Sequence, residues 1–265
     1  MGLNIIVCAK QVPDPEGPPS SFEVNEAERK VTVRGIPPVV NPFDENALEA
    51  AIRIKEATGA EITLLSAGKG ISKAVILKAM ATGADASLLV EGDDLDAAFL
   101  DSFSTARLLA AAIGKADGFD LILCGRQAAD TNAGLVGLGL AHLLGIPAIT
   151  LAQKVEIDGD KVVVERLLPD GYEVVEASLP ALVTVSGEVG DLRYPSLQAI
   201  KAAKSLPQAV LGLAELDLDL SGSGRIETVA VAAPSRERRC TLVDGDTPEE
   251  AGKKLALLLR QEKVL

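Results

Sequence analysis

Histidine and cysteine are scarce in this sequence, and their scarcity excludes several kinds of site. Among 265 residues there are one histidine and three cysteines. The cysteines, Cys8, Cys124 and Cys240, lie far apart, and no Cys-x-x-Cys pair occurs. A zinc site needs several such ligands, and a Cys–His catalytic pair needs a histidine beside the thiol, so neither is expected. Cys8 and Cys124 lie in apolar runs and are predicted to fill core, and the single His142, in a helical pattern, is predicted to be structural.

Aromatic and basic residues are also few. Aromatic residues make up 3 % of the chain, with no tryptophan, against 48 % hydrophobic residues. The core must therefore be aliphatic, and a bound flavin or adenine would be held by aliphatic walls and backbone groups. Lys and Arg number 26 against 38 Asp and Glu, a formal charge of −12. Nucleic acid and anionic lipid both need a basic face, so neither is expected as a partner.

Long apolar runs are absent as well. No segment approaches 18 apolar residues, so no membrane insertion is expected. The apolar run within residues 1–8 is too short for a signal peptide. These features predict a soluble protein of the cytoplasm or of a matrix-like compartment.

Strand-like and helix-like patterns alternate through the first 150 residues. This alternation predicts an α/β fold, with parallel strands, right-handed crossovers and helices on both faces of the sheet. The expected strands are 4–9, 61–67, 86–90 and 119–124. One helix is expected to begin at Asn41–Asp44, and three more are expected over 71–81, 97–113 and 133–144. Residues 22–24 and 30–33 are predicted as a pair of short edge strands.

The pattern changes after residue 149. Residues 154–157 and 161–166 flank Asp158-Gly159, which predicts a β-hairpin. With strands at 172–177 and 181–186, residues 154–186 are predicted as an antiparallel extension of the same sheet. The rest of the chain is predicted as a helix over 198–204, a surface linker over 206–224, a strand over 225–231 and a helix capped by Thr247.

The loop after the strand at 119–124 is the first candidate site. A polar turn, residues 125–130, precedes a helix predicted to begin at Thr131 or Asn132, both good N-cap types. Such a turn points several backbone N–H groups at one spot, which suits a phosphate. The loops after Ala9 and Ser66 leave the same edge of the sheet, where ligands of such sheets lie. Many α/β proteins have such a turn and bind nothing there, so both interpretations stay open.

No catalytic constellation is found in the sequence. There is no Gly-x-Gly-x-x-Gly, no phosphate-binding Gly-Lys-Ser/Thr loop and no serine in an elbow motif. The loop carboxylates Asp14, Asp44 and Asp130 are interpreted as solvated or capping groups. We therefore predict no catalytic residue and no metal site.

Four motifs in register make the chain similar to the beta subunits of electron transfer flavoproteins. They are Lys10-Gln11-Val12-Pro13-Asp14, Asn41-Pro42-Phe43-Asp44, Gly125-Arg126-Gln127-Ala128-Ala129-Asp130 and Arg193-Tyr194-Pro195-Ser196-Leu197. The resemblance covers nearly the whole chain. It implies a fold like that of the adenine nucleotide alpha hydrolases and a heterodimer with a larger alpha subunit that carries FAD.

The resemblance also implies a bound nucleotide in this subunit. Ordinary members hold AMP, and electron-bifurcating members hold a second FAD, which would add NADH-oxidising flavin-based electron bifurcation to the role of electron carrier. Residues 10–14 and Arg126 favour the second branch, but AMP and FAD both stay open. Carried over by position, the nucleotide contacts are Ala9, Asn41, Pro42, Phe43, Asp44, Ala67, Gly125, Arg126, Gln127, Ala128, Asp130, Thr131, Asn132, Ala133, Gly134, Leu135 and Val136.

The nucleotide loop departs from the family pattern at two positions. The family usually has more polar residues here, whereas the side chains of Ala133 and Leu135 cannot form hydrogen bonds. The backbone amides of residues 131–136, at the start of a helix, are therefore expected to meet the phosphate.

Three residues match positions that bind partners in the family. Leu197, with Tyr194, lies in the family's recognition loop, where an exposed leucine anchors acyl-CoA dehydrogenase-type partners. The alternative is a leucine folded back on its own subunit. Glu165 matches a glutamate that pairs with an arginine of the alpha subunit's mobile flavin domain, and the alternative is a plain strand carboxylate. Residues 201–206 are less basic than in the mitochondrial type, which leaves the identity of the flavin dehydrogenase open.

The predicted organisation follows from these motifs. Residues 1–190 are predicted to form the nucleotide-binding domain, and residues 191–265 the recognition loop and a C-terminal arm that wraps the partner subunit. A stand-alone ATP- or AMP-binding module of the stress-protein type is the alternative function. Such a module would end near residue 150, so the longer chain favours an electron carrier without chemistry of its own.

Overall fold

The computed structural model describes residues 2–93, 95, 101–219, 224, 226–234 and 240–264. The chain forms two compact units, which are described separately. The larger comprises Met1–Glu23 and Val31–Val229, and the smaller comprises Val24–Lys30 and Ala230–Leu265. The larger unit extends past residue 190, where the sequence predicted a boundary.

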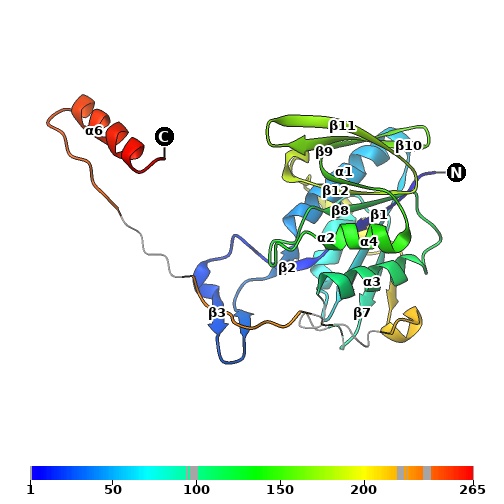
Figure 1. Ribbon diagram of the computed structural model, residues 1–265. Helices are drawn as coiled ribbons and strands as arrows, with labels where there is room; N and C mark the ends of the chain where they lie inside the picture. The colour runs from blue at the N-terminus through cyan, green and yellow to red at the C-terminus, as the bar shows by residue number, and fades with distance from the viewer. Residues whose placement is uncertain are drawn as a thin grey trace. The chain divides into compact units, whose positions relative to one another are not determined.

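A nine-stranded sheet forms the centre of the larger unit (Figure 1), in the order β11-β10-β9-β12-β8-β1-β6-β7-β13. From β9 to β13 of this order, neighbouring strands are parallel, and β10 and β11 are antiparallel. The strands are β1 (Asn4–Cys8), β6 (Glu61–Gly68), β7 (Ala86–Glu91), β8 (Leu121–Gly125), β9 (Ala148–Asp158), β10 (Lys161–Leu168), β11 (Gly171–Ser178), β12 (Ala181–Val185) and β13 (Gln208–Leu211). The predicted α/β fold is confirmed.

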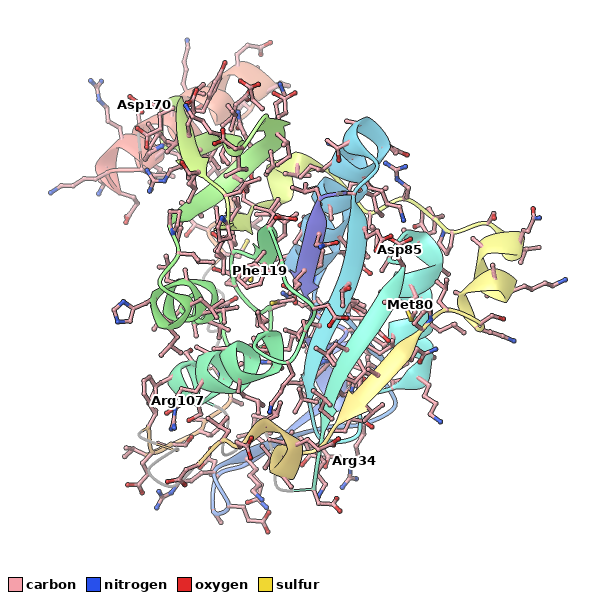
Figure 2. All side chains as sticks on the ribbon, turned by 90° about the vertical axis from the view of Figure 1, so that its right-hand side faces the viewer. Arg34, Met80, Asp85, Arg107, Phe119 and Asp170 are labelled. Atoms are coloured by element: carbon pink, nitrogen blue, oxygen red, sulfur yellow. The ribbon has the colours of Figure 1, made fainter. Side chains whose placement is uncertain are left out.

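Four helices cover the two faces of the sheet. Helices α1 (Pro42–Thr58) and α2 (Lys73–Thr82) share one apolar core with the sheet, and α3 (Ser102–Ile113) and α4 (Val136–Leu144) share another. Met80, labelled in Figure 2, belongs to the first core and is 2 % exposed. Cys8 and Cys124 are neighbours in register on β1 and β8 and are both buried, as predicted. The sequence predicted that α3 begins at residue 97, and residues 96–100 lie outside the part of the chain that the structure describes.

The order of the strands creates a switch point between β1 and β8. From β1 the chain moves through β6 to β7 on one side, and then returns to place β8 on the other side of β1. The chain after β1 leads to α1 on one face of the sheet, and the chain after β8 leads to α4 on the other face. Open α/β sheets bind ligands at such a switch point.

The last strand of the predicted antiparallel extension, β12, has a different direction from the one predicted. The hairpin of β9 and β10 is confirmed, with Asp170 in the next turn (Figure 2), and β10 and β11 are antiparallel. However, β12 is parallel to both β8 and β9, so the predicted antiparallel stretch 154–186 is wrong over its last strand. The β10–β11 hairpin folds outward from β9, which lets the chain return and insert β12 beside β8.

Two further sequence predictions are wrong near the end of the larger unit. The stretch 206–224, predicted as a surface linker, contains β13, which pairs with β7, and the short helix η3 (Leu213–Leu216), whose Leu216 is buried. Residues 226–231 are not a strand, and Ile226 and Val229 are exposed, so no sheet face buries these two apolar side chains.

The remaining elements are short or peripheral. Helix α5 (Leu197–Ala203) packs on α2, close to its predicted position, and α6 (Pro248–Gln261) has Thr247 as N-cap, as predicted. The ribbons are β2 (Gln11–Pro13) with β5 (Pro38–Val40) and β3 (Phe22–Asn25) with β4 (Lys30–Val33), and the other short helices are η1 (Pro19–Ser21) and η2 (Gly187–Val189). Strands β3 and β4 pair as predicted, but as a separate sheet. No described helix is both long and apolar enough to cross a membrane.

Candidate functional site

Three loops meet at the carboxyl ends of β1, β6 and β8. The Lys10 ammonium lies 2.7 Å from a carboxylate oxygen of Asp130, which joins the loop after β1 to the loop after β8. The Gln11 side chain accepts a hydrogen bond of 2.6 Å from the Ser72 amide and donates one of 3.4 Å to the Gly70 carbonyl, which joins it to the loop after β6. The predicted convergence of these loops is confirmed.

The first turn of α1 holds two of these loops together. Asn41 Nδ2 donates to the Gln127 carbonyl at 2.8 Å, and Asn41 Oδ1 accepts from the Ala129 amide at 3.0 Å. Asp44 Oδ2 accepts from the Lys10 amide at 2.7 Å, and its Oδ1 accepts from the Gly125 amide at 3.0 Å. Both side chains are buried. The polar atoms of these two predicted contact residues are therefore already engaged in fixing the loops.

The glycine at the end of β8 is required by the close approach of α1. A Cβ at Gly125 would lie 2.4 Å from Asp44 Oδ1 and 2.6 Å from the backbone carbon of Phe43. Both distances are far below van der Waals contact, so a side chain here would push α1 away from β8.

Arg126 provides a buried polar group without a partner. Its guanidinium lies over the Phe43 ring, 4.7 Å from the centroid. Within the residues that the structure describes, Arg126 Nε is buried and has no hydrogen-bond partner. A buried cationic donor left unpaired is costly, so this position fits an anionic group from a ligand or another subunit.

The loop between β8 and α4 differs from its prediction. Asn132 (φ 51°) and Gly134 (φ 64°) adopt left-handed conformations, which a right-handed helix cannot include. Helix α4 therefore begins at Val136, after Leu135, and not at Thr131 or Asn132. Asn132 Oδ1 instead accepts from Gln127 Nε2 at 3.0 Å, inside the loop.

The amides of this loop are not all available to a ligand. Those of Thr131 and Asn132 both donate to the Ala128 carbonyl, at 3.3 and 2.8 Å. The expectation that all amides of residues 131–136 face a phosphate is thus wrong for the first two, because the turn uses them. Residues 130–135 are exposed, which leaves the loop accessible from outside.

The two predicted alanines lie at the ends of central strands. Ala9 follows β1, is buried, and donates its amide to the Leu65 carbonyl at 2.8 Å. Ala67 lies in β6 and is half-buried. Such small residues let another group approach the strand ends closely.

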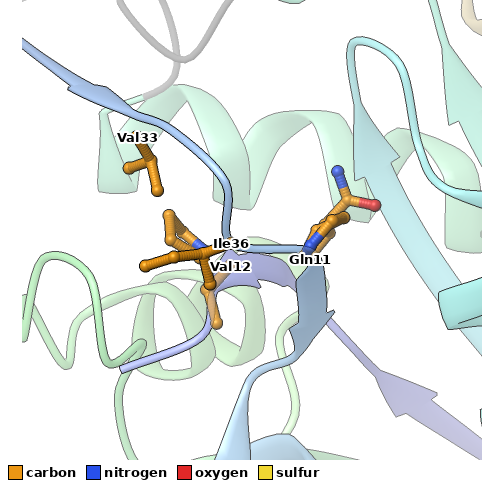
Figure 3. A pocket seen from close by; sticks show the side chains of 6 residues that line it. Gln11, Val12, Val33 and Ile36 are labelled. Carbon is orange, nitrogen blue, oxygen red and sulfur yellow. The ribbon is translucent and has the colours of Figure 1, made fainter. Parts of the chain in front are cut away.

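A small cavity lies beside the loop after β1 (Figure 3). Its volume is about 200 Å³, and it is lined by Gln11, Val12, Pro13, Val33, Ile36 and Pro38. The lining is aliphatic apart from the Gln11 amide. None of the predicted nucleotide contacts lines it, and the sequence did not single it out.

The two predicted recognition-loop residues are exposed. Tyr194 is 94 % exposed and Leu197 is 81 % exposed. Leu197 is the first residue of α5, whose N-cap Ser196 accepts a hydrogen bond from the Ala199 amide at 3.1 Å. The alternative in which this leucine folds back on its own subunit is wrong.

The third predicted partner residue is already paired. The Glu165 carboxylate on β10 accepts from Gln153 Nε2 at 3.1 Å and lies 3.7 Å from the Lys154 ammonium. Its side chain is 27 % exposed. Another cation would have to share or replace these contacts.

The environment of Asp44 makes the stability of the site depend on pH. Burial raises the pKa of Asp44 to about 7, although hydrogen bonds from the Lys10 and Gly125 amides lower it. Between pH 4 and 7, the folded state therefore holds a proton on Asp44 that the unfolded state has lost. The stabilisation from this group is complete below pH 4 and is lost as the pH rises through 7.

We expect Asp44→Asn to remove this pH dependence. The free energy of unfolding of the wild type, minus that of the variant, should fall by roughly 4 kcal/mol at most between pH 4 and 8, because each pKa unit is worth about 1.4 kcal/mol. Urea unfolding of both proteins across this range measures the difference. A difference that does not vary with pH would show that Asp44 titrates normally.

No metal centre accompanies these loops in the described ranges, where no group of three or more His, Cys, Asp or Glu residues could hold an ion. The site therefore consists of backbone amides, two cationic side chains and buried polar groups that fix the loops. Such a site can bind an anion and hold it still.

Comparison with known proteins gives one consistent family. Residues 30–234 match the "Electron transfer flavoprotein domain". The "Electron transfer flavoprotein subunit beta" of Thermoanaerobacterium thermosaccharolyticum is 38 % identical over 253 residues, 93 % of this chain and 94 % of the relative. The protein of the same name from Bacillus subtilis is 35 % identical, covering 99 % and 100 %. A subunit of the "Caffeyl-CoA reductase-Etf complex" of Acetobacterium woodii is 32 % identical, also covering 99 % and 100 %.

Proposed function

Since this chain belongs to the electron transfer flavoprotein family and matches its beta subunits over nearly its whole length, we propose that it pairs with an FAD-carrying alpha subunit and itself holds an adenine nucleotide. Beta subunits of this family serve electron transfer and are not enzymes by themselves. The stand-alone nucleotide module, the alternative from the sequence, is not favoured, because the matches extend far beyond residue 150.

The observation that carries the nucleotide proposal is the unpaired Arg126 Nε at the strand switch point. It lies on the loop after β8, which Lys10–Asp130 and Asn41 join to the neighbouring segments. We assign the anionic part of the nucleotide to this loop. Arg126, and Lys10 after exchange of Asp130 for the ligand, would supply positive charge.

The backbone would supply the remaining contacts. Ala133, Gly134, Leu135 and Val136 lead into α4, and their amides are the ones left after Thr131 and Asn132 have been used in the turn. The start of α4 adds its positive end. A bound FAD would accept and release electrons, whereas AMP would serve only as a structural ligand.

The exposed residues suit a partner enzyme. We propose that Leu197 and Tyr194 hold the redox partner while Glu165 tethers the flavin domain of the alpha subunit. Among the relatives are a subunit of a caffeyl-CoA reductase complex and the "Acryloyl-CoA reductase electron transfer subunit gamma" of Anaerotignum propionicum. These names support a flavin enzyme that acts on acyl-CoA substrates as the partner class.

The smaller unit suits the alpha subunit. Helix α6 is amphipathic: Ala251, Leu255, Leu258 and Leu259 lie on one side at spacings of three and four, and no residue of this helix is buried. An exposed apolar stripe on a charged helix is typical of a surface that another chain covers. We therefore propose that the C-terminal arm within residues 191–265 wraps the alpha subunit.

Co-expression with the alpha subunit tests the heterodimer. The two chains should copurify as a yellow 1:1 complex, and its flavin should be reduced by an acyl-CoA dehydrogenase-type partner with its substrate. The chain expressed alone serves as the control and should accept no electrons from the dehydrogenase through the alpha subunit's FAD, which it lacks. A colourless monomer that binds ATP in both preparations would contradict the proposal.

A further inference from the structure

One stripe of polar residues on α1 faces the segment that precedes the recognition loop. Asn46, Glu49, Arg53 and Glu56 follow one another at spacings of three and four residues, which places them on one side of the helix. All four form hydrogen bonds to residues 189–193. This side of α1 therefore provides four polar side chains that all contact one short segment.

The first two contacts hold the backbone of that segment. Asn46 Nδ2 donates to the Gly190 carbonyl at 2.7 Å, and Arg53 Nη1 donates to the Val189 carbonyl at 2.8 Å. Gly190 has φ 108°, a conformation that favours glycine. The course of the chain just before Arg193 is therefore fixed on α1.

The next contact holds the Arg193 side chain. The Glu49 carboxylate accepts from Arg193 Nε at 3.1 Å, from Nη2 at 2.9 Å and from the Arg193 amide at 3.3 Å. Glu49 is 3 % exposed, and it also accepts from Arg53 Nε at 3.0 Å. Glu56 accepts from Arg193 Nη1. Arg193 is thus held between two carboxylates by a planar fork of donors, which a lysine cannot reproduce.

The ionisation of the pair agrees with this geometry. Burial alone would raise the pKa of Glu49, but hydrogen bonds from Arg193 and Arg53 lower it below its ordinary value. The same hydrogen bonds raise the pKa of Arg193. Both groups therefore stay charged near neutral pH, when the recognition loop would be in use.

The exposed residues follow directly. Tyr194 is next to Arg193, and Leu197 begins α5, whose Ala203 is buried. Residues 194–197 therefore lie between two segments that are held in place. Arg193 is bound to α1, and α5 packs on α2.

We propose that Arg193, clamped by Glu49 and Glu56, is a positioning residue that sets the direction in which Tyr194 and Leu197 meet the redox partner. The inference rests on the proposed role of Leu197 as anchor. It also gives α1 two functions, because Asn41 and Asp44 in its first turn fix the nucleotide loops while its next turns fix the partner loop.

A double-mutant cycle in the heterodimer tests this role. Arg193→Gln, Leu197→Ala and the double variant are compared for electron transfer from an acyl-CoA dehydrogenase, with the heterodimer as the varied substrate. Arg193→Gln should raise KM about tenfold and leave kcat nearly unchanged, since a displaced anchor weakens binding only. The double variant should lose less affinity than the two single effects added together, because Arg193 acts in part through that leucine.

The controls separate positioning from stability. Lys78→Gln removes an exposed ion pair with Glu45 of α1, remote in sequence from residues 189–197, and should leave KM unchanged. Arg193→Lys should recover only part of the lost affinity. Amide hydrogen exchange should rise at residues 193–199 in Arg193→Gln and stay unchanged at the nucleotide loop 125–136.

Each other outcome overturns a defined claim. If Leu197→Ala raises KM but Arg193→Gln does not, or if their effects add, the positioning role is wrong while the proposed function stands. If Leu197→Ala itself leaves KM unchanged, the proposed anchor fails, and the positioning role fails with it.

Discussion

A heterodimer with Leu197→Ala should fold, bind its nucleotide and yet lose about 30-fold in kcat/KM for electron exchange with its partner dehydrogenase, since a central anchor contributes about 2 kcal/mol or more. The reason is geometric. Leu197 is 81 % exposed at the start of α5, so a partner pocket can desolvate a side chain that its own subunit leaves in water. Steady-state kinetics with varied heterodimer concentration measure the loss.

A matched control uses another exposed aliphatic residue. Val210 on β13 is 54 % exposed, and Val210→Ala should leave the rate constant unchanged. The far-UV spectrum, melting temperature and flavin content of both variants should equal those of the wild type. Equal electron transfer by Leu197→Ala and wild type would remove this residue from the partner surface.

A methyl group at Gly125 should have the second large effect. In Gly125→Ala, the new Cβ would lie 2.4 Å from Asp44 Oδ1 and 2.6 Å from the Phe43 backbone, so α1 must move away from β8. Such overpacking costs about 1–3 kcal/mol, and the hydrogen bond from the Gly125 amide to Asp44 is lost as well. We expect a lower free energy of unfolding and most nucleotide lost on purification.

Gly187→Ala is the control for this substitution. A Cβ at Gly187 would have no neighbour within 4 Å, so this variant should keep both stability and nucleotide. Urea unfolding and chromatography of the released nucleotide give the two readouts. A Gly125→Ala protein that retains its stability and full nucleotide content would show that the close approach of α1 is not needed for binding.

The parallel half of the fold could be predicted because its strands are buried on both faces and appear as continuous apolar runs. Residues 5–8 and 121–124 are such runs, and glycines such as Gly59 and Gly145 mark the ends of helices. Strand β13 was missed because it has only four residues, three of them exposed, and because its pairing with β7 is a long-range contact. The direction of β12 was missed for a similar reason, since nothing local distinguishes a parallel from an antiparallel neighbour.

The candidate site was predicted in outline and corrected in detail. Strand ends identified the three loops, but local N-cap preference placed the start of α4 at Thr131 or Asn132. The left-handed Asn132 and Gly134 override that preference, and the Gln127 side chain engages Asn132 instead. The hydrogen bonds of Asn41 and Asp44 connect residues more than thirty positions apart, which no local pattern reveals.

Arg193 belongs to one of the four motifs, but its pairing with Glu49 was not predicted. A local signal did exist, because Glu49 interrupts an apolar stretch of α1 between Leu48 and Ala50. A carboxylate in such a position must find a cation, yet the sequence does not say which of 26 basic residues supplies it. Only the fold, which brings residue 193 onto α1, identifies the partner.

The nucleotide content of the purified heterodimer decides whether this chain holds an adenine nucleotide. Heat releases the ligands, and chromatography with absorbance detection counts flavin and AMP per heterodimer. We expect one adenine nucleotide in this chain besides the FAD of the alpha subunit, found as either two FAD or one FAD with one AMP. One FAD and no second nucleotide would contradict it, because the loops around Arg126 would then hold no ligand.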